Sequence, residues 1–226
     1  MNKNSSLKKH IGVISYIIGI VLYIYLLFII QNGKFIFSTF GIVITFLLFS
    51  VLMAVFAYTS IDPNKNNKKK IIKFTVYHLF VFYILILYSV LFQNSLRIDF
   101  AKNALTIDFV TFCRYNINLI PLKNIVYSFQ INTGYVIKNI IVNVLAFIPM
   151  SIFILYLFFI QNKKILFAFT NISIIFFIEF LQVITRRGVF DIDDIIFNLI
   201  GVLLGYVIYK YVNIYVKSKK GINMMT

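Results

Sequence analysis

The chain has 226 residues, of which 61% are hydrophobic and 13% are charged, and its mean hydropathy is +0.90. Soluble domains carry roughly 25% charged residues, so this composition predicts an integral membrane protein with a helical core. The net charge of +15 does not indicate a nucleic-acid partner, because the lysines cluster at the ends of apolar runs and the sequence has no nucleic-acid-binding motif. One cysteine excludes an intrachain disulfide, and two distant histidines argue against a histidine-based metal site.

Six apolar segments are long enough to span a bilayer, which takes about 20 residues. They are residues 11–30, 36–58, 74–93, 139–160, 166–184 and 195–215. The first follows three lysines, as a signal peptide would, but its apolar run is too long for one and no small-residue cleavage site follows. We therefore predict an all-α polytopic bundle that contacts the lipid bilayer through about six transmembrane helices. The frequent Ile, Lys, Asn, Phe and Tyr are typical of an AT-rich genome and favour a bacterial cytoplasmic membrane.

The basic residues predict how the bundle is oriented. Fourteen of the 22 lysines and arginines fall in four segments. If both termini lie on the same side of the membrane, these four segments lie on that side as well. These segments are residues 1–10, 59–73, 161–165 and 210–226. Six of the seven acidic residues fall on or near the other side, and only Asp62 does not. The positive-inside rule then predicts that both termini face the cytoplasm.

The chain divides into three predicted regions. Residues 1–93 form an N-terminal transmembrane region of three spans, and residues 139–216 form a C-terminal core of three more. Residues 94–138 between them form one long outer loop. Its segments LTIDFVTF (105–112) and INLIPL (117–122) are too apolar for a plain linker. We predict that this loop lies partly in the membrane interface or dips into the mouth of the bundle.

The fourth span contains Asn143, Phe147 and Pro149. Pro149 removes the hydrogen-bond donor for the carbonyl of Leu145, so the helix should kink there. Asn143 and Phe147 share a helix face. The kink and the amide could form the wall of a site, or they could serve packing alone.

Glu179 is the only glutamate, and it lies inside the apolar run 173–185. A carboxylate at membrane depth costs about 2.5–3.5 kcal/mol on insertion scales, so such residues usually face the interior of the bundle. Gln182, three residues later, shares its helix face. Glu179 is therefore the candidate catalytic residue, as a base, an acid or a cation ligand. The alternative is a structural polar contact to a neighbouring helix.

Two arginines and three aspartates follow within nine residues, at Arg186, Arg187, Asp191, Asp193 and Asp194. Asp191 is a good helix N-cap and Asp194 stands at N3, an acidic variant of the capping box. Capping accounts for one or two of the acids but less well for three. The three carboxylates, which lie near Glu179, could hold a divalent cation, or the arginines could neutralise them in a salt-bridged gate.

One helix face then carries Asp194, Asn198, Gly201 and Gly205, at i, i+4, i+7 and i+11. The two glycines are predicted to let a neighbouring helix approach closely. Asn198 extends the polar line from the outer end of the helix into the bilayer. With the motifs above, this face predicts an outward-facing polar pocket. Its lining is Asn143, Glu179, Gln182, Arg187, Asp191, Asp193, Asp194 and Asn198.

The order and spacing of these motifs resemble the VanZ-like membrane protein family over residues 114 to about 208. The matching elements are Asn118-x-x-Pro121, Asn143-x-x-x-Phe147-x-Pro149, Glu179-x-x-Gln182, Arg187-Gly188-x-Phe190-Asp191-x-Asp193-Asp194 and Asn198-x-x-Gly201-x-x-x-Gly205. Ser151 departs from the family pattern, which usually has glycine, so close packing is not expected at that turn. Residues 1–93 show no match to the pattern.

The resemblance implies a link to glycopeptide resistance, notably to teicoplanin, and it supplies no established mechanism. The leading prediction is a binding or modifying role at the cell envelope that lowers glycopeptide access, with a lipid-linked cell-wall precursor or the glycopeptide as ligand. One alternative is an intramembrane enzyme for such a lipid, with Glu179 as general base. Another is a small-ion or proton-coupled transporter with Glu179 and Asp194 as relay points. No cofactor is predicted, and a divalent cation is kept as an alternative.

Overall fold

The computed structural model describes residues 3–31, 39–61, 67–92, 103–123, 125–126, 129, 133–158 and 163–219. Within these residues five helices are long and apolar enough to cross a membrane. A sixth helix is apolar over the shorter stretch Ile44–Ser60. The predicted all-α membrane class is confirmed, whereas the count of six spans and the orientation stay predictions. Of the predicted spans and outer loop, residues 36–38, 93–102, 124, 127–128, 130–132 and 159–160 lie outside the described residues.

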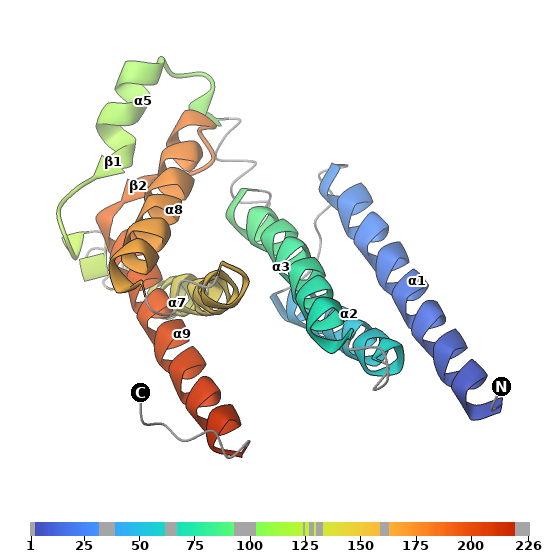
Figure 1. The fold of residues 1–226 in the computed structure, drawn as a ribbon. Coiled ribbons are helices and arrows are strands. Elements are labelled where there is room, and N and C mark those ends of the chain that lie inside the picture. The colour runs from blue at the N-terminus through green and yellow to red at the C-terminus, as the bar shows by residue number, and fades with distance from the viewer. Residues whose placement is uncertain are drawn as a thin grey trace. The chain divides into compact units, whose positions relative to one another are not determined.

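The chain forms two compact units, Met1–Leu96 and Arg97–Thr226. The first consists of α1 (Lys3–Gln31), α2 (Thr39–Ser60) and α3 (Lys68–Phe92) (Figure 1). Its core is formed by apolar side chains from all three helices, namely Leu26, Phe49, Met53, Phe82 and Ile86. The rings of Phe49 and Phe82 stack with centroids 4.0 Å apart, which joins α2 to α3.

The second unit is built on α7 (Thr133–Leu157), α8 (Lys164–Ile184) and α9 (Ile192–Lys219). α7 and α9 pack closely because Gly201 and Gly205 present no side chain to α7. A Cβ atom at Gly201 would collide with the carbonyl oxygen of Val144, and one at Gly205 would lie 2.5 Å from that of Ile148. α7 runs through Pro149. The predicted kink there stays a prediction.

The Ser151 hydroxyl donates a hydrogen bond of 2.9 Å to the carbonyl oxygen of Val202, across the same interface between α7 and α9. Ser151 is completely buried and lies 2.9 Å from the position of a Cβ atom on Gly205. The serine therefore packs closely against Gly205 of α9. The expectation of looser packing at this turn was wrong, because the hydroxyl finds a buried backbone acceptor.

The burial pattern of α8 is the reverse of that of a soluble helix. Its buried residues are the polar Asn171, Glu179 and Gln182 and the apolar Phe167, Ile175 and Val183, while its other phenylalanines lie exposed. Glu179 is 2% exposed and its neighbour Phe180 is 57% exposed. A helix with apolar residues outside and polar residues inside suits lipid as its surroundings.

A short helix and two strands cover one end of this unit. α5 (Phe109–Asn116) leads into β1 (Ile117–Asn118), which pairs in parallel with β2 (Phe190–Asp191), with Ile117 opposite Phe190 and Asn118 opposite Asp191. Asp108 caps α5 by accepting a hydrogen bond of 3.0 Å from the backbone N–H of Thr111. Hydrogen bonds from the side chain and backbone of Thr111 lower the pKa of Asp108.

The segment around α5 and β1 exposes a series of apolar side chains. They are Leu105, Ile107, Phe109, Val110, Tyr115, Ile117, Leu119, Ile120 and Leu122. Residues 105–112 form a turn and the first half of α5. Such exposure is consistent with the predicted position in the membrane interface, since lipid would cover these side chains.

Candidate functional site

The turn after α8 joins the α5 segment to the bundle. α8 ends in a Schellman motif, in which Arg187 N–H donates to the Gln182 carbonyl at 2.8 Å and Arg186 N–H donates to the Val183 carbonyl at 2.9 Å. Arg186 adopts the left-handed backbone conformation of this motif, with φ of 53°. Its guanidinium Nη1 donates to the carbonyls of Ala104 and Ile107, both at 2.7 Å. These bonds hold the guanidinium of Arg186 at the backbone before α5. The predicted neutralisation of the aspartates therefore does not depend on Arg186.

Asp191 holds together the strand pair and the start of α9. Its Oδ1 accepts hydrogen bonds of 3.0 Å from Asn118 Nδ2 and from the backbone N–H of Asp193. The second bond is an N-cap bond to the first turn of α9. Asn118 in turn accepts from Ile120 N–H at 3.2 Å, which shapes the loop after β1.

Asp193 fastens that same loop to α9. Its Oδ1 accepts a hydrogen bond of 2.7 Å from the backbone N–H of Leu122, a residue with φ of 63°. A leucine rarely adopts this left-handed conformation, so surrounding contacts must hold it there. Asp193 is 3% exposed, and its Oδ2 accepts no hydrogen bond from the described residues. One oxygen of this buried carboxylate therefore holds the loop, and the other has no hydrogen-bond partner among the described residues.

Asp194 joins α9 to α7. Its Oδ1 accepts hydrogen bonds from Asn143 Nδ2 at 2.6 Å and from Asn139 Nδ2 at 3.2 Å. The two amides lie four residues apart and so share one face of α7. Each of the three aspartates thus binds a different element, which accounts for their number better than capping alone.

The inner part of the candidate site lies on α8 and α9, which pack against each other. Glu179 and Gln182 are buried on the inward face of α8, and Asn198 is buried one turn beyond Asp194 on α9. Asn198 Oδ1 accepts no hydrogen bond within the described part of the chain. Buried amides and carboxylates of this kind are costly in a membrane helix, which makes them candidates for function.

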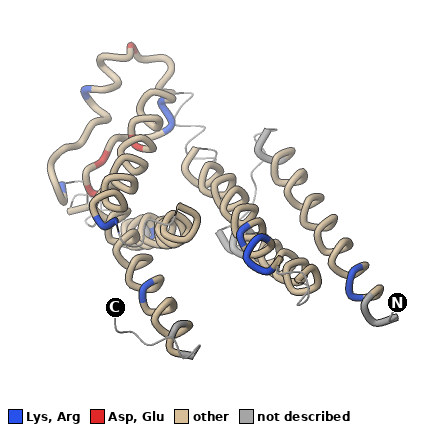
Figure 2. The backbone as a smooth tube through the Cα atoms, viewed as in Figure 1, with Lys and Arg blue, Asp and Glu red and all other residues tan. Residues whose placement is uncertain are grey.

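The structure brings some of the predicted pocket residues into direct contact and leaves others as neighbours on packed helices. Asn143 bonds to Asp194 and Asp191 bonds to Asp193. Arg187 is half-buried in the turn that precedes β2. Acidic positions gather where β2 meets α9 (Figure 2). Among the described residues no three His, Cys, Asp or Glu side chains are grouped to hold a metal ion, so the divalent cation stays a prediction.

Two residues that bind the aspartates, Asn118 and Asn139, were not part of the predicted pocket. Asn118 was recognised only as part of the motif before Pro121. Asn139 could have been found, because it precedes Asn143 by four residues and therefore shares its helix face. The strand pairing that brings Asn118 to Asp191 gives no comparable signal, since each strand has only two residues.

Replacing Asp193 by alanine should loosen the loop after β1. The loss of a hydrogen bond to a charged acceptor costs roughly 1.5–3 kcal/mol, so the opened loop should become about tenfold more populated. Limited trypsin digestion of the detergent-solubilised protein should then cut after the exposed Lys123 about tenfold faster. Asp193→Asn is the control, because its side-chain oxygen can still accept from Leu122 N–H. Equal cleavage rates in wild type and Asp193→Ala would show that the bond does not hold the loop.

A family model described as VanZ/LLP1 matches residues 80–214, which is more than half of the chain. The match starts within α3, upstream of the motifs quoted above. It includes β1, β2, the three aspartates and the residues that bind them. The comparisons with curated proteins and with solved structures found no match. The resemblance noted in the sequence is therefore confirmed, and this multi-pass membrane protein belongs to the VanZ/LLP1 family.

Proposed function

We propose that this VanZ-like protein contributes to resistance against glycopeptides of the teicoplanin type, in the cytoplasmic membrane of a bacterium. The proposal rests on one observation besides the family: polar side chains are buried within three helices whose outer surfaces are apolar. Those of the proposed site are Asn143, Glu179, Gln182, Asp193 and Asn198. Their burial supports an intramembrane polar site that faces outward in the proposed orientation.

The ligand proposed for this site is a lipid-linked cell-wall precursor, with the glycopeptide itself as the other choice. Arg187 and the N-terminus of α9 would favour a phosphate group, because both supply positive charge or N–H donors. The neighbouring aspartates would repel a bare anion. A divalent cation beside Asp193 would then have to bridge the two negative charges, and a chelator should lower the melting temperature of wild type but not of Asp193→Asn.

An intramembrane enzyme acting on the same lipid is the second candidate function. It is favoured by two buried acceptors, Asp193 Oδ2 and Asn198 Oδ1, that no described residue satisfies. Buried polar atoms are nearly always hydrogen-bonded, so such atoms suit a bound substrate donor or an ion. Product formation from a lipid-linked precursor, lost in Glu179→Gln, would distinguish the enzyme from a binding protein. A proton- or ion-coupled transporter would instead show a cation gradient dependence of resistance.

Glu179→Gln is the variant that tests the proposed site. It preserves shape and hydrogen bonding but removes the charge, so the protein should reach normal membrane levels and the teicoplanin tolerance of the expressing cells should fall to that of cells with empty vector. Asn171→Ala is a matched control, because Asn171 is a buried polar residue on the same face of α8, two turns away. It should keep the tolerance of wild type.

Two outcomes would contradict the proposal in different ways. If wild type itself gives no tolerance at verified membrane levels, the resistance function is wrong. If wild type and Glu179→Gln give equal tolerance while Glu179→Leu fails to accumulate, Glu179 serves structure and the proposed site is wrong.

A further inference from the structure

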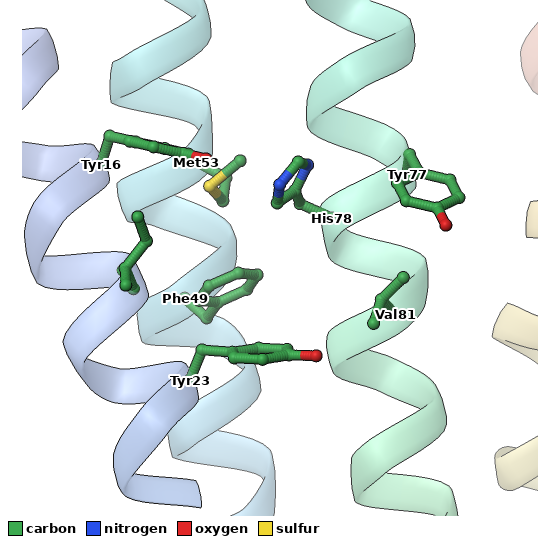
Figure 3. Close-up of a pocket in the computed structure, with 9 residues that line it drawn as sticks. Tyr16, Tyr23, Phe49, Met53, Tyr77, His78 and Val81 are labelled. Atoms are coloured by element: carbon green, nitrogen blue, oxygen red, sulfur yellow. The ribbon is translucent and has the colours of Figure 1, made fainter. Parts of the chain in front are cut away.

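The first unit contains a cavity that the proposed function does not use. It has a volume of about 330 Å³ and lies among α1, α2 and α3. Each helix contributes side chains to its walls, including Tyr16 and Tyr23, Phe49 and Met53, and Tyr77 and His78. Figure 3 shows His78 pointing from α3 toward the side chains of α1 and α2. The volume falls within the range of small-molecule sites, roughly 300–1,000 Å³, and the walls are mostly apolar and aromatic, as in such sites.

The cavity reaches the outer surface of the unit. Ile20 and Tyr77 line it and are also 40% and 57% exposed. Both lie in helices that are long and apolar enough to cross a membrane, so lipid would cover their exposed surfaces. His78 uses Nδ1 in a hydrogen bond of 2.9 Å with the carbonyl oxygen of Phe74 in its own helix. A ligand that enters from the bilayer and meets these walls must be largely apolar.

A basic cluster lies at one end of the same three helices. It consists of Lys8 and Lys9 near the start of α1 and of Lys68, Lys69, Lys70 and Lys73 at the start of α3 (Figure 2). The end of α2 joins these two starts. Lys8 Nζ lies 4.5 Å from the ring centroid of Tyr58, and Asn67 Nδ2 donates to the Ser60 carbonyl at 3.2 Å. The start of α1, the end of α2 and the start of α3 therefore lie at the same end of the unit, and their lysines share that end.

The cluster and the cavity are close enough for one molecule to occupy both. Lys73 precedes the cavity residue Tyr77 by four residues, which is about 6 Å along the helix axis. We infer that this unit binds an anionic phospholipid, with its phosphate on the lysines and one acyl chain in the cavity. Lysines that flank transmembrane helices often serve orientation alone, and that role would explain the cluster. It would not explain an apolar cavity one helical turn away.

Retention of lipid by the purified full-length protein tests the inference. Native mass spectrometry in detergent should show one bound phosphatidylglycerol, and phosphatidylcholine with the same acyl chains should bind about tenfold more weakly. Replacing Lys68, Lys69, Lys70 and Lys73 together by glutamine should remove this preference. Gly19→Leu should fill the cavity and abolish retention of either lipid. A Cβ atom at Gly19 meets Phe49 and Met53 only at ordinary distances of 3.5 and 3.9 Å, so the position has room for a side chain.

The control adds the same side chain outside the cavity. Ala54 is exposed on α2, and Ala54→Leu should retain phosphatidylglycerol like wild type. If Gly19→Leu does not accumulate, Val81→Phe fills the cavity from α3 and gives the same expected loss. Both lipids carry a phosphate, but only phosphatidylglycerol has a net negative charge. Equal binding of the two lipids by wild type would therefore overturn the part of the inference in which the lysines select an anionic lipid. Full retention by both cavity-filling variants would overturn the acyl-chain part. Neither result bears on the proposed function.

Discussion

Replacing Gly201 by alanine should lower the melting temperature of the detergent-solubilised protein by about 5 °C. The added methyl group would collide with the carbonyl oxygen of Val144 and would lie 3.1 Å from Phe147 Cβ. A backbone oxygen cannot rotate away as a flexible side chain can, so α7 and α9 must separate. Overpacking of this kind costs about 1–3 kcal/mol, and in a protein of this size each kcal/mol shifts the melting temperature by roughly 2–4 °C.

Gly19→Ala provides the matched control for this prediction. It makes the same chemical change in another membrane-spanning helix, where the nearest described atom would be 3.5 Å from the new Cβ. Alanine in a helix interior is favoured over glycine by about 1 kcal/mol, so this variant should melt at the wild-type temperature or slightly above it. Unchanged melting of Gly201→Ala would mean that α7 and α9 are not held as closely as their hydrogen bond at Ser151 indicates.

Hydropathy was sufficient to predict the class of the protein and the centre of each long helix, but not where the helices begin. α1 starts at Lys3 rather than at residue 11, α3 at Lys68 rather than at 74, and α7 at Thr133 rather than at 139. A hydropathy window ends where polar residues begin. Lysine nevertheless has good helix propensity, and its long stem can reach the interface from a turn inside it. Helical structure therefore continues past the apolar run.

The group of Asp191, Asp193 and Asp194 was visible in the sequence because acidic residues are rare in this chain. Most of the residues that bind these aspartates could not be recognised from the sequence. Asp193 bonds to the backbone of Leu122, 71 residues away, and Asp191 bonds to Asn118, 73 residues away. A backbone N–H is present at every residue except proline, so it has no signature that a pattern could detect. The acidic character of this group could be predicted from composition, but the hydrogen bonds that it makes depend on tertiary structure.

Exchanging the acid and the amide between Asp194 and Asn143 should separate the role of their hydrogen bond from that of the charge. Asn143→Asp alone places two carboxylates where the structure has an amide 2.6 Å from a carboxylate oxygen. Their repulsion and the lost bond should lower the melting temperature by about 5–10 °C, since a hydrogen bond to a charged group contributes roughly 1.5–3 kcal/mol. Asp194→Asn alone keeps an acceptor but weakens it. The double variant Asn143→Asp with Asp194→Asn restores one acid and one amide and should recover more than half of the loss.

The comparison of the four proteins forms a double-mutant cycle, which isolates the coupling between the two side chains. Asn139→Ala serves as the control within α7, because its bond to the same oxygen is longer, at 3.2 Å, and its loss should cost less. Additive effects of the two exchanges would show that Asp194 and Asn143 do not interact. A strong coupling with normal teicoplanin tolerance in the double variant would show that this pair serves the packing of α7 against α9. A strong coupling with lost tolerance would instead place the position of the charge itself within the functional site.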